Sequence, residues 1–250
     1  MILVLGGTRE GREIVDLLLN KNYMVIASVT SNYGAELLSK YNIRINREKL
    51  NQKQLSDLIQ QKEINLIIDA THPFARKISK NAIEAARKNN IKYIRYERKK
   101  VKIKPKYDHI IKRVSDYKEA AQKAKKYKKI FLTIGSNNLS YFTEHIANWK
   151  KRLVVRILPV SKYLKKLENK GFSPVNIIAV QGPFSQEFNQ IIIKNYKIEV
   201  LVTKASGRKG GLDTKIKAAY SQNIPIILLE RPGLDYEVVV SNYKELLKLV

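Results

Sequence analysis

Residues 2–19, ILVLGGTREGREIVDLLL, contain the pattern that decides the fold. The four apolar residues Ile2–Leu5 predict a buried strand, and the amphipathic run Arg9–Leu19 predicts a helix. The intervening turn, residues 6–11, contains three glycines. An apolar strand that passes through a glycine-rich turn directly into a helix is typical of the first unit of a parallel α/β sheet.

The same turn has the properties of an anion site. The first N–H groups of a helix lack partners within the helix and lie at the positive end of its dipole, where a phosphate binds. Gly6 permits a tight turn, Gly11 permits close packing of helix against sheet, and Thr8 places a hydroxyl where the usual fingerprint has glycine. We therefore predict a dinucleotide site here, with a turn that serves packing alone as the alternative. The predicted contacts are Gly6, Gly7, Thr8, Glu10 and Gly11.

The rest of the chain alternates apolar and amphipathic runs in two similar halves. In the first half, further strands are predicted at 23–29, 65–70 and 92–96, and helices at 35–40, 54–61 and 74–88. In the second half, strands are predicted at 109–114, 130–134, 153–157, 176–180, 200–203 and 224–229. The helices predicted there are 116–125, 162–169, 185–195, 214–220 and 243–249. Unbroken apolar strands separated by helices indicate parallel sheets covered on both faces.

The predicted fold class is therefore α/β, with two Rossmann-like, doubly wound parallel-sheet domains. Residues 1–100 are predicted to bind the dinucleotide, and 107–250 to complete a cofactor and substrate cleft between the domains. Residues 98–106 alternate lysines with apolar residues and end in Lys-Pro-Lys, which predicts a linker. An edge strand that carries lysines against aggregation is the alternative.

Composition narrows the classes of protein. The absence of cysteine excludes disulfides, cysteine-ligated metals and a thiol nucleophile, and it fits a cytoplasmic protein. No apolar run approaches the roughly 18 residues of a membrane span, and the short apolar start predicts a strand rather than a signal peptide. The net charge of +26 attracts anions such as nucleic acid, acidic lipids or polyanionic metabolites. A lysine-rich, solvated surface explains that charge equally well.

Polar residues stand at the ends of several predicted strands, where open α/β sheets bind ligands. After the second strand come Ser28, Thr30 and Ser31, without an acidic residue before Glu36. An acid at this position binds the ribose 2′-hydroxyl of NAD, so its absence favours NADPH over NADH. The alternative is that these hydroxyls only decorate the strand end.

Two further motifs end strands in the first half. Residues 69–75, DATHPFA, place Thr71 and His72 beside a helix start, and a hydrogen-bonded turn is the alternative to a functional histidine. Residues 95–98, RYER, offer Arg95 and Arg98 as ligands for a carboxylate, with an Arg–Glu pair as the alternative.

Three loops of the second half also follow strands. Residues 133–137 include Ser136, residues 181–184 are QGPF, and residues 203–211 combine Lys204 with glycines and hydroxyls. The last loop can hold a phosphate or a carboxylate, although it is not a P-loop because its lysine precedes the glycines. The sequence contains no familiar hydrolase, protease or kinase motif and no metal site, so a bound cofactor is the natural source of the chemistry.

In order and spacing, the turn at 6–11 and the motifs DATHPFA, RYER, QGPF and Lys204-x-Ser206-Gly207 resemble the precorrin-6A reductases, including the cobalt-precorrin-6A branch, of cobalamin biosynthesis. The resemblance spans essentially the whole chain. It implies hydride transfer from NADPH or NADH to a double bond of a corrinoid, followed by protonation of the adjacent carbon. The substrate is a polycarboxylate tetrapyrrole, which gives the excess of basic residues a purpose.

The resemblance also implies roles for particular residues. His72 is expected to be catalytic. Further cofactor contacts are expected from Ser28, Thr30, Ser31, Thr71, Gly182, Pro183 and Phe184. Substrate contacts are expected from Arg95, Arg98, Ser136, Lys204, Ser206 and Gly207. No metal, nucleic acid or membrane is expected as a partner.

Two alternatives remain open at this stage. One is another Rossmann-fold oxidoreductase that acts on a small acidic substrate. The other is a basic nucleic-acid-binding protein that uses residues 92–129, which contain 16 basic and four acidic residues.

Overall fold

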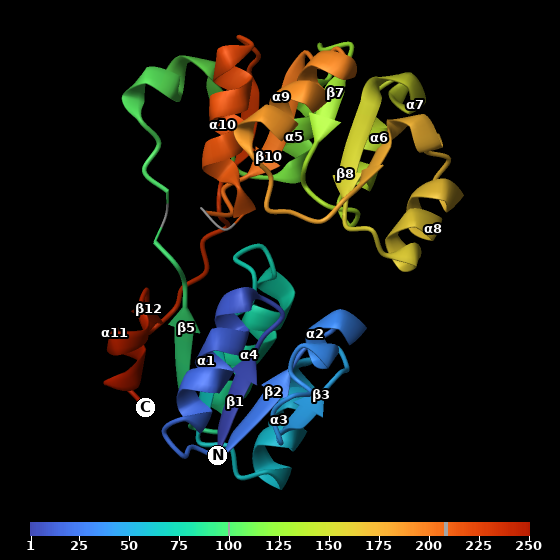
Figure 1. Cartoon of the computed structure of the whole chain (residues 1–250). Helices are drawn as coiled ribbons and strands as arrows, with labels where there is room; N and C mark the ends of the chain where they lie inside the picture. The colour runs from blue at the N-terminus through green and yellow to red at the C-terminus, as the bar shows by residue number, and fades with distance from the viewer. Residues whose placement is uncertain (100, 208–209) are drawn as a thin grey trace. The chain divides into compact units, whose positions relative to one another are not determined.

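The computed structural model describes residues 1–99, 101–207 and 210–250, and the chain forms two compact α/β units (Figure 1). Unit 1 consists of Met1–Lys99 and Gly233–Val250, and unit 2 of Lys100–Pro232. Lys100 of the predicted linker, and Arg208 and Lys209 of the predicted 203–211 loop, lie outside the described residues.

Unit 1 contains a six-stranded sheet in the order β12-β5-β4-β1-β2-β3. Its strands are β1 (Ile2–Leu5), β2 (Val25–Ser28), β3 (Arg44–Asn46), β4 (Leu66–Asp69), β5 (Lys92–Tyr96) and β12 (Val239–Val240), all paired in parallel. Its helices are α1 (Arg9–Leu19), α2 (Asn32–Glu36), α3 (Gln52–Gln61), α4 (Arg76–Lys88) and α11 (Tyr243–Leu247). Because side chains alternate along each strand, Val4 and Leu3 enter separate cores on the two faces of the sheet.

Unit 2 contains a second parallel sheet, in the order β6-β11-β10-β7-β8-β9. Its strands are β6 (Ile111–Val114), β7 (Ile130–Leu132), β8 (Leu153–Ile157), β9 (Ile177–Ala179), β10 (Val200–Lys204) and β11 (Ile226–Leu229). Its helices are α5 (Tyr117–Ala124), α6 (Ser140–His145), α7 (Trp149–Arg152), α8 (Ser161–Asn169), α9 (Gln186–Asn195) and α10 (Leu212–Ser221), with 3₁₀ turns η1 (Pro105–Ile110) and η2 (Pro174–Asn176). The predicted doubly wound α/β fold class is confirmed.

The two sheets have equivalent orders. β7 and β10 occupy in unit 2 the central places that β1 and β4 occupy in unit 1. In both sheets the order reverses between these two strands. Ligands of open α/β sheets bind outside the carboxyl ends of the strands at such a point. The equivalence therefore marks one candidate site in each unit.

The predicted second domain, 107–250, is wrong at its end. Residues 233–250 belong to unit 1, where Val239 and Val240 pair with Arg95 and Tyr96 of β5. Val240 and Leu246 are buried in the same core as Tyr96, and this burial holds the segment on unit 1. A strand of two residues is too short for alternation to reveal it in the sequence.

The linker region contains no strand among its described residues, so the edge-strand alternative is wrong there. None of the helices in the described part of the chain combines the length and apolar character that crossing a bilayer requires. Among the same residues, no group of three His, Asp or Glu side chains is placed to hold a metal ion.

Candidate functional site

Thr8 fixes the turn between β1 and α1. Its Oγ1 accepts a hydrogen bond from the Gly11 backbone N–H at 3.1 Å and donates one to the Ala70 carbonyl at 2.9 Å. Thr8 is thus the N-cap of α1 and also a link to the end of β4. The residue that departs from the usual glycine fingerprint therefore joins the two strands at which the sheet order reverses.

The glycines of this turn meet distinct requirements. Gly7 has a φ of +103°, which residues with side chains rarely adopt. Apart from Gly7 itself and its two neighbours in the chain, no atom of the described residues lies within 4 Å of where a Cβ would stand. A Cβ on Gly11 would lie 3.0 Å from the Gly6 Cα, so Gly11 allows α1 to pass directly against the turn. The backbone is thus open at Gly7 and closely packed at Gly11. Such a turn at a helix N-terminus fits the pyrophosphate of a dinucleotide.

Glu10 and Arg98, predicted to bind cofactor and substrate respectively, form an ion pair with each other. Arg98 Nη1 lies 3.1 Å from Glu10 Oε1, and the Glu10 side chain is 7% exposed. A buried carboxylate in a phosphate-binding turn would repel a phosphate, and the guanidinium offsets that charge. The structure therefore brings the predicted cofactor contact Glu10 and the predicted substrate contact Arg98 together in one ion pair beside this turn.

Arg95 is completely buried and binds the end of β4. Its Nη1 donates to Asp69 Oδ1 at 2.8 Å and to Thr71 Oγ1 at 3.1 Å, and its Nη2 donates to the Thr71 carbonyl at 3.0 Å. Thr71 Oγ1 also donates to Asp69 Oδ1 at 2.7 Å, while the Tyr93 hydroxyl donates to Asp69 Oδ2 at 2.7 Å. This network fixes the 69–71 turn.

The predicted substrate contact from Arg95 does not fit this environment. Burial by itself lowers the pKa of Arg95, but Asp69 and other nearby groups outweigh that effect and raise it above its usual value. Burial, with Asp69, likewise raises the pKa of Tyr93. Arg95 is a positively charged support for the turn, and Thr71, predicted to bind cofactor, belongs to the same support.

His72 lies at the start of the loop that follows β4. It is half-buried, and its Nδ1 accepts a hydrogen bond from the Phe74 N–H at 3.2 Å. A ring nitrogen that accepts a hydrogen bond carries no proton, so the proton of the neutral ring resides on Nε2. The hydrogen bond thus selects one tautomer of the predicted catalytic histidine.

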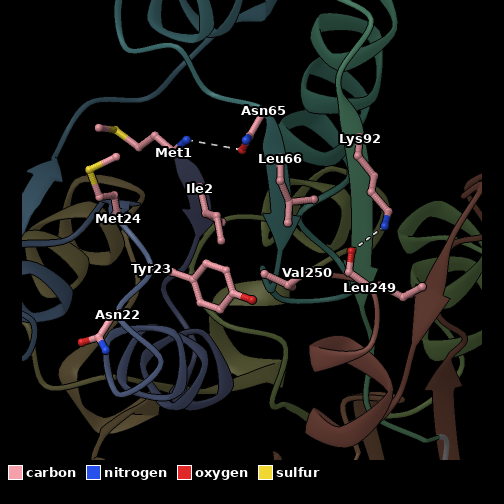
Figure 2. Close-up of a pocket in the computed structure, with 10 residues that line it drawn as sticks. All are labelled: Met1, Ile2, Asn22, Tyr23, Met24, Asn65, Leu66, Lys92, Leu249 and Val250. Atoms are coloured by element: carbon pink, nitrogen blue, oxygen red, sulfur yellow. Dashed lines mark hydrogen bonds between the residues drawn. The ribbon is translucent and has the colours of Figure 1, made fainter.

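These elements of unit 1 converge around one small polar hollow. Its lining comprises Thr8, Glu10, Ala70, Thr71, Pro73, Arg95, Tyr96, Glu97 and Arg98. A larger hollow lies at the opposite edge of the same sheet, at the amino ends of its strands, as Figure 2 shows for Ile2, Leu66 and Lys92. The smaller hollow is the stronger candidate because it lies at the carboxyl ends of the strands, beside the glycine turn.

The three hydroxyls at the end of β2 have different environments. Ser28 is buried and its hydroxyl accepts from the Asn46 amide at 3.2 Å, while Ser31 caps α2 by accepting from the Gly34 N–H at 3.0 Å. Thr30 is exposed. Of the three predicted contacts, Ser28 is buried, whereas Thr30 and Ser31 are exposed and the Ser31 hydroxyl is engaged as the cap of α2.

In unit 2 the predicted residues again lie in loops after strands. Ser136 is buried after β7, next to Gly135 with a φ of +81°. Ser206 and Gly207 are buried after β10, and a Cβ on Gly210 would lie 2.1 Å from Ser206 Oγ. Ser206 therefore packs against the backbone of its own loop. Burial lowers the pKa of Lys204 to about 8.

Two residues of unit 2 were missed by the sequence analysis. Arg156 of β8 and Lys215 of α10 are each 6% exposed. The Arg156 guanidinium lies 4.0 Å from the centre of the Phe184 ring and 5.2 Å from that of Phe131. An arginine inside the apolar strand LVVRI was the available signal, as it was for Arg95 in KYIRY. The guanidinium of Arg156 on β8 thus contacts the ring of Phe184, which is one of the predicted cofactor contacts with Gly182 and Pro183.

Two doubly wound parallel sheets, each with polar loops where its strand order reverses, define a Rossmann-like protein. The family model described as Precorrin-6x reductase CbiJ/CobK matches residues 1–250. The chain therefore belongs to this family of reductases, as its motifs predicted. This assignment selects the reductase among the alternatives that the sequence left open.

Individual relatives cover nearly the whole chain. The cobalt-precorrin-6A reductase of Priestia megaterium is 38% identical over 247 residues, which cover 98% of this chain and 96% of the relative. The cobalt-precorrin-6A reductase of Methanocaldococcus jannaschii is 36% identical over 252 residues, which cover 100% of this chain and 97% of the relative. A solved structure of CobK precorrin-6A reductase has a TM-score of 0.80 at 23% identity and shows the same fold. The match covers 99% of this chain and 94% of the CobK chain.

Proposed function

We propose that this chain reduces one carbon–carbon double bond of cobalt-precorrin-6A with a reduced nicotinamide coenzyme, as a step of cobalamin biosynthesis. The supporting observation is family membership over all 250 residues together with 36–38% identity to two relatives that carry the cobalt-precorrin-6A name. The solved CobK structure, named for precorrin-6A, is 23% identical. This difference in identity favours the cobalt-containing substrate. The absence of cysteine fits a reducing cytoplasm, where we place the reaction.

Unit 1 is the proposed site for the dinucleotide. Gly6, Gly7 and Thr8 hold the pyrophosphate against the N-terminus of α1, and Arg98 neutralises Glu10 beneath it. Thr30 stands where an acid would reject a 2′-phosphate, so we propose NADPH as the preferred coenzyme. When bound, the reduced nicotinamide supplies the hydride. Gly182, Pro183 and Phe184 remain proposed contacts for the same coenzyme.

The reaction adds a hydride to one carbon of the double bond and a proton to its neighbour, and the oxidised coenzyme is released. His72 is the proposed catalytic residue because it lies at the end of β4, two residues beyond Ala70 of the hollow. In the tautomer that the hydrogen bond from Phe74 selects, it offers an N–H from Nε2. Delivery of that proton would leave an anionic ring, so proton transfer from His72 requires Nδ1 to release Phe74 and become protonated first.

The test is an anaerobic assay that follows nicotinamide oxidation with cobalt-precorrin-6A and with its cobalt-free form. We expect faster turnover of the cobalt form and a product that has gained one hydride and one proton, as mass spectrometry would show. Gly11→Val should lower turnover at limiting coenzyme on the order of 10-fold, and Lys125→Ala, which replaces an exposed lysine, serves as the control. Absence of oxidation with both macrocycles would contradict the proposal.

Lys204 is the cation we propose for a substrate carboxylate, together with Ser136, Ser206 and Gly207. A charge-assisted hydrogen bond contributes about 1.5–3 kcal/mol, so Lys204→Ala should raise the KM for the macrocycle roughly 10- to 150-fold. Lys125→Ala should leave KM nearly unchanged, since any contribution from an exposed charge is screened by salt. Equal KM values for the two variants would leave only a diffuse basic surface.

A further inference from the structure

Three basic side chains gather at the carboxyl ends of the strands in unit 2. Arg156 is on β8, Lys204 ends β10, and Lys215 is in the first half of α10. Arg156 and Lys204 both act on the charge of Lys215, so the three lie within electrostatic range of one another. Arg156 and Lys215 are buried, which is rare for such side chains unless they are paired.

The strand register brings two hydroxyls to the same place. Leu132 of β7 is level with Val155 of β8 and Val202 of β10, so the next residues, Arg156, Thr133 and Thr203, are also level. Residues at one level of neighbouring parallel strands point to the same face. Each of these three residues stands two positions after a residue of the hydrophobic core that α9 and α10 cover. Their side chains therefore point to the face of the sheet that these two helices cover.

The hydrogen-bond partners of Arg156 and Lys215 are neutral. Arg156 donates to the amide oxygen of Asn189 on α9 at 2.9 Å. Lys215 Nζ donates to the Gly210 carbonyl at 2.9 Å and lies 3.3 Å from Thr203 Oγ1. Among the described residues, no carboxylate forms an ion pair with Arg156 or Lys215. Arg156 and Lys215 are thus two buried basic side chains without an ion-paired carboxylate in the described part of the chain.

The electrostatic effect of this arrangement is visible in the pKa values. Burial lowers the pKa of Arg156 to about 10. Burial, followed by repulsion from Arg156 and Lys204, lowers the pKa of Lys215 to about 7. A nearby anion would raise the pKa of Lys215, because it would stabilise the protonated amine.

We propose that Arg156, Lys204 and Lys215, with the hydroxyl of Thr203, form an oxyanion site in unit 2. Buried charges are tolerated when a partner compensates them, and this cluster lies at the switch point of its sheet, where ligands bind. The oxyanion is a phosphate of the coenzyme or a carboxylate of the macrocycle. Only the choice between these two sources rests on the proposed function.

Titration calorimetry of the full chain with inorganic pyrophosphate tests the site without turnover. At a pH of about 8 Lys215 is largely neutral, so an anion beside it should draw a proton from the buffer. Two buffers with different ionisation enthalpies reveal that uptake. We expect uptake in the wild type and in Lys217→Met, an exposed lysine of the same helix paired with Asp213, and its loss in Lys215→Met.

A second variant guards against a failure of Lys215→Met to fold. Arg156→Gln should weaken pyrophosphate binding on the order of 10-fold or more, whereas Arg113→Gln, which removes an exposed arginine paired with Glu230, should change it less than about twofold. Equal proton uptake in the wild type and Lys215→Met, or equal affinity in Arg156→Gln and Arg113→Gln, would overturn the site.

Coenzyme and substrate measurements then identify the oxyanion. A weaker Kd for NADPH in Lys215→Met would assign a coenzyme phosphate to the site. A raised KM for the macrocycle with unchanged NADPH affinity would assign a substrate carboxylate. If neither changes in the folded variant, the site does not serve the reactants and the proposal fails. A wild type that binds pyrophosphate with proton uptake but reduces no corrinoid would refute the proposed function alone.

Discussion

Arg95 in unit 1 and Arg156 in unit 2 are both buried arginines within parallel strands, yet their surroundings are opposite. Arg95 donates to a carboxylate, Asp69, at 2.8 Å, and its pKa is raised despite its burial. Arg156 donates to a neutral amide, Asn189, at 2.9 Å, and burial lowers its pKa to about 10. The comparison teaches that burial of a cation alone does not reveal its role. A cation with its own carboxylate supports the fold, whereas the one that donates to a neutral amide is the one for which we propose an external anion.

The largest effect should come from removing the carboxylate of unit 1. Asp69→Asn removes the buried carboxylate that lies 2.8 Å from Arg95 and leaves the partly exposed Glu97, 3.4 Å from Arg95 Nε. Breaking a buried pair costs about 3–5 kcal/mol of unfolding free energy, which is the upper bound for this variant because Glu97 remains. Asp213→Asn, which breaks an exposed pair with Lys217, should cost less than about 1 kcal/mol. Urea denaturation of both variants measures the difference. Similar losses would mean that the Arg95 pair does not support unit 1 as described.

The next effect is a pH dependence that arises from unit 2. The pKa of Lys215 is about 7 in the folded chain and near 10.5 when unfolded, so the unfolded chain binds more protons between these values. The free energy of unfolding should therefore rise, on the order of a few kcal/mol, from about pH 7 towards about pH 9. Lys215→Met should reduce that rise. Denaturation curves measured from about pH 7 to about pH 9 give this pH dependence. An equal rise in the free energy of unfolding for wild type and Lys215→Met would show that protonation of Lys215 does not destabilise the folded chain.

A smaller effect should distinguish which unit holds the pyrophosphate of the coenzyme. In Gly11→Val the side chain meets the Gly6 backbone, and overpacking of this kind costs about 1–3 kcal/mol, so NADPH binding should weaken on the order of 10-fold. Fluorescence titration of NADPH measures it. Unchanged affinity in the folded variant would move the pyrophosphate away from the turn of unit 1 and make the unit 2 cluster the stronger candidate.

The smallest effect concerns the choice of coenzyme. Thr30→Asp places a carboxylate at the exposed end of β2, where it should repel a 2′-phosphate and shift preference towards NADH by a few-fold or more. The ratio of kcat/KM for NADPH and NADH reports this shift. A wild type that already prefers NADH strongly would show that the lack of an acid before Glu36 does not set the preference.

The sequence predicted the fold and the glycine turn because both depend on local patterns. Strand, turn and helix at 2–19 follow from alternating apolar runs, and their observed bounds agree at Ile2–Leu5 and Arg9–Leu19. The role of Arg95 could not be predicted in this way. Its partner Asp69 lies in another strand, and only the tertiary pairing of β4 with β5 brings the two together.

The burial of Lys215 could not be predicted from the local sequence either. The predicted helix 214–220 covered it, but helix periodicity does not decide whether a lysine between apolar positions reaches solvent. Thr203 and Gly210, which Lys215 contacts, belong to a loop and strand end whose positions depend on the whole sheet. Ser31 was predicted as a cofactor contact because it follows a strand that lacks an acid at its end. Its use as the cap of α2 depends on where that short helix begins.

The strand β12 has a consequence for the order in which the protein can mature. Unit 2 is one uninterrupted stretch of chain, whereas unit 1 is completed by residues that follow unit 2. During synthesis Ile94 and Tyr96 therefore remain without the cover of Val240 and Leu246 until all of unit 2 has left the ribosome. Domains generally fold as units while the chain is made, so unit 2 can be finished first although it starts later. The second unit in the sequence is the first that can be complete in time.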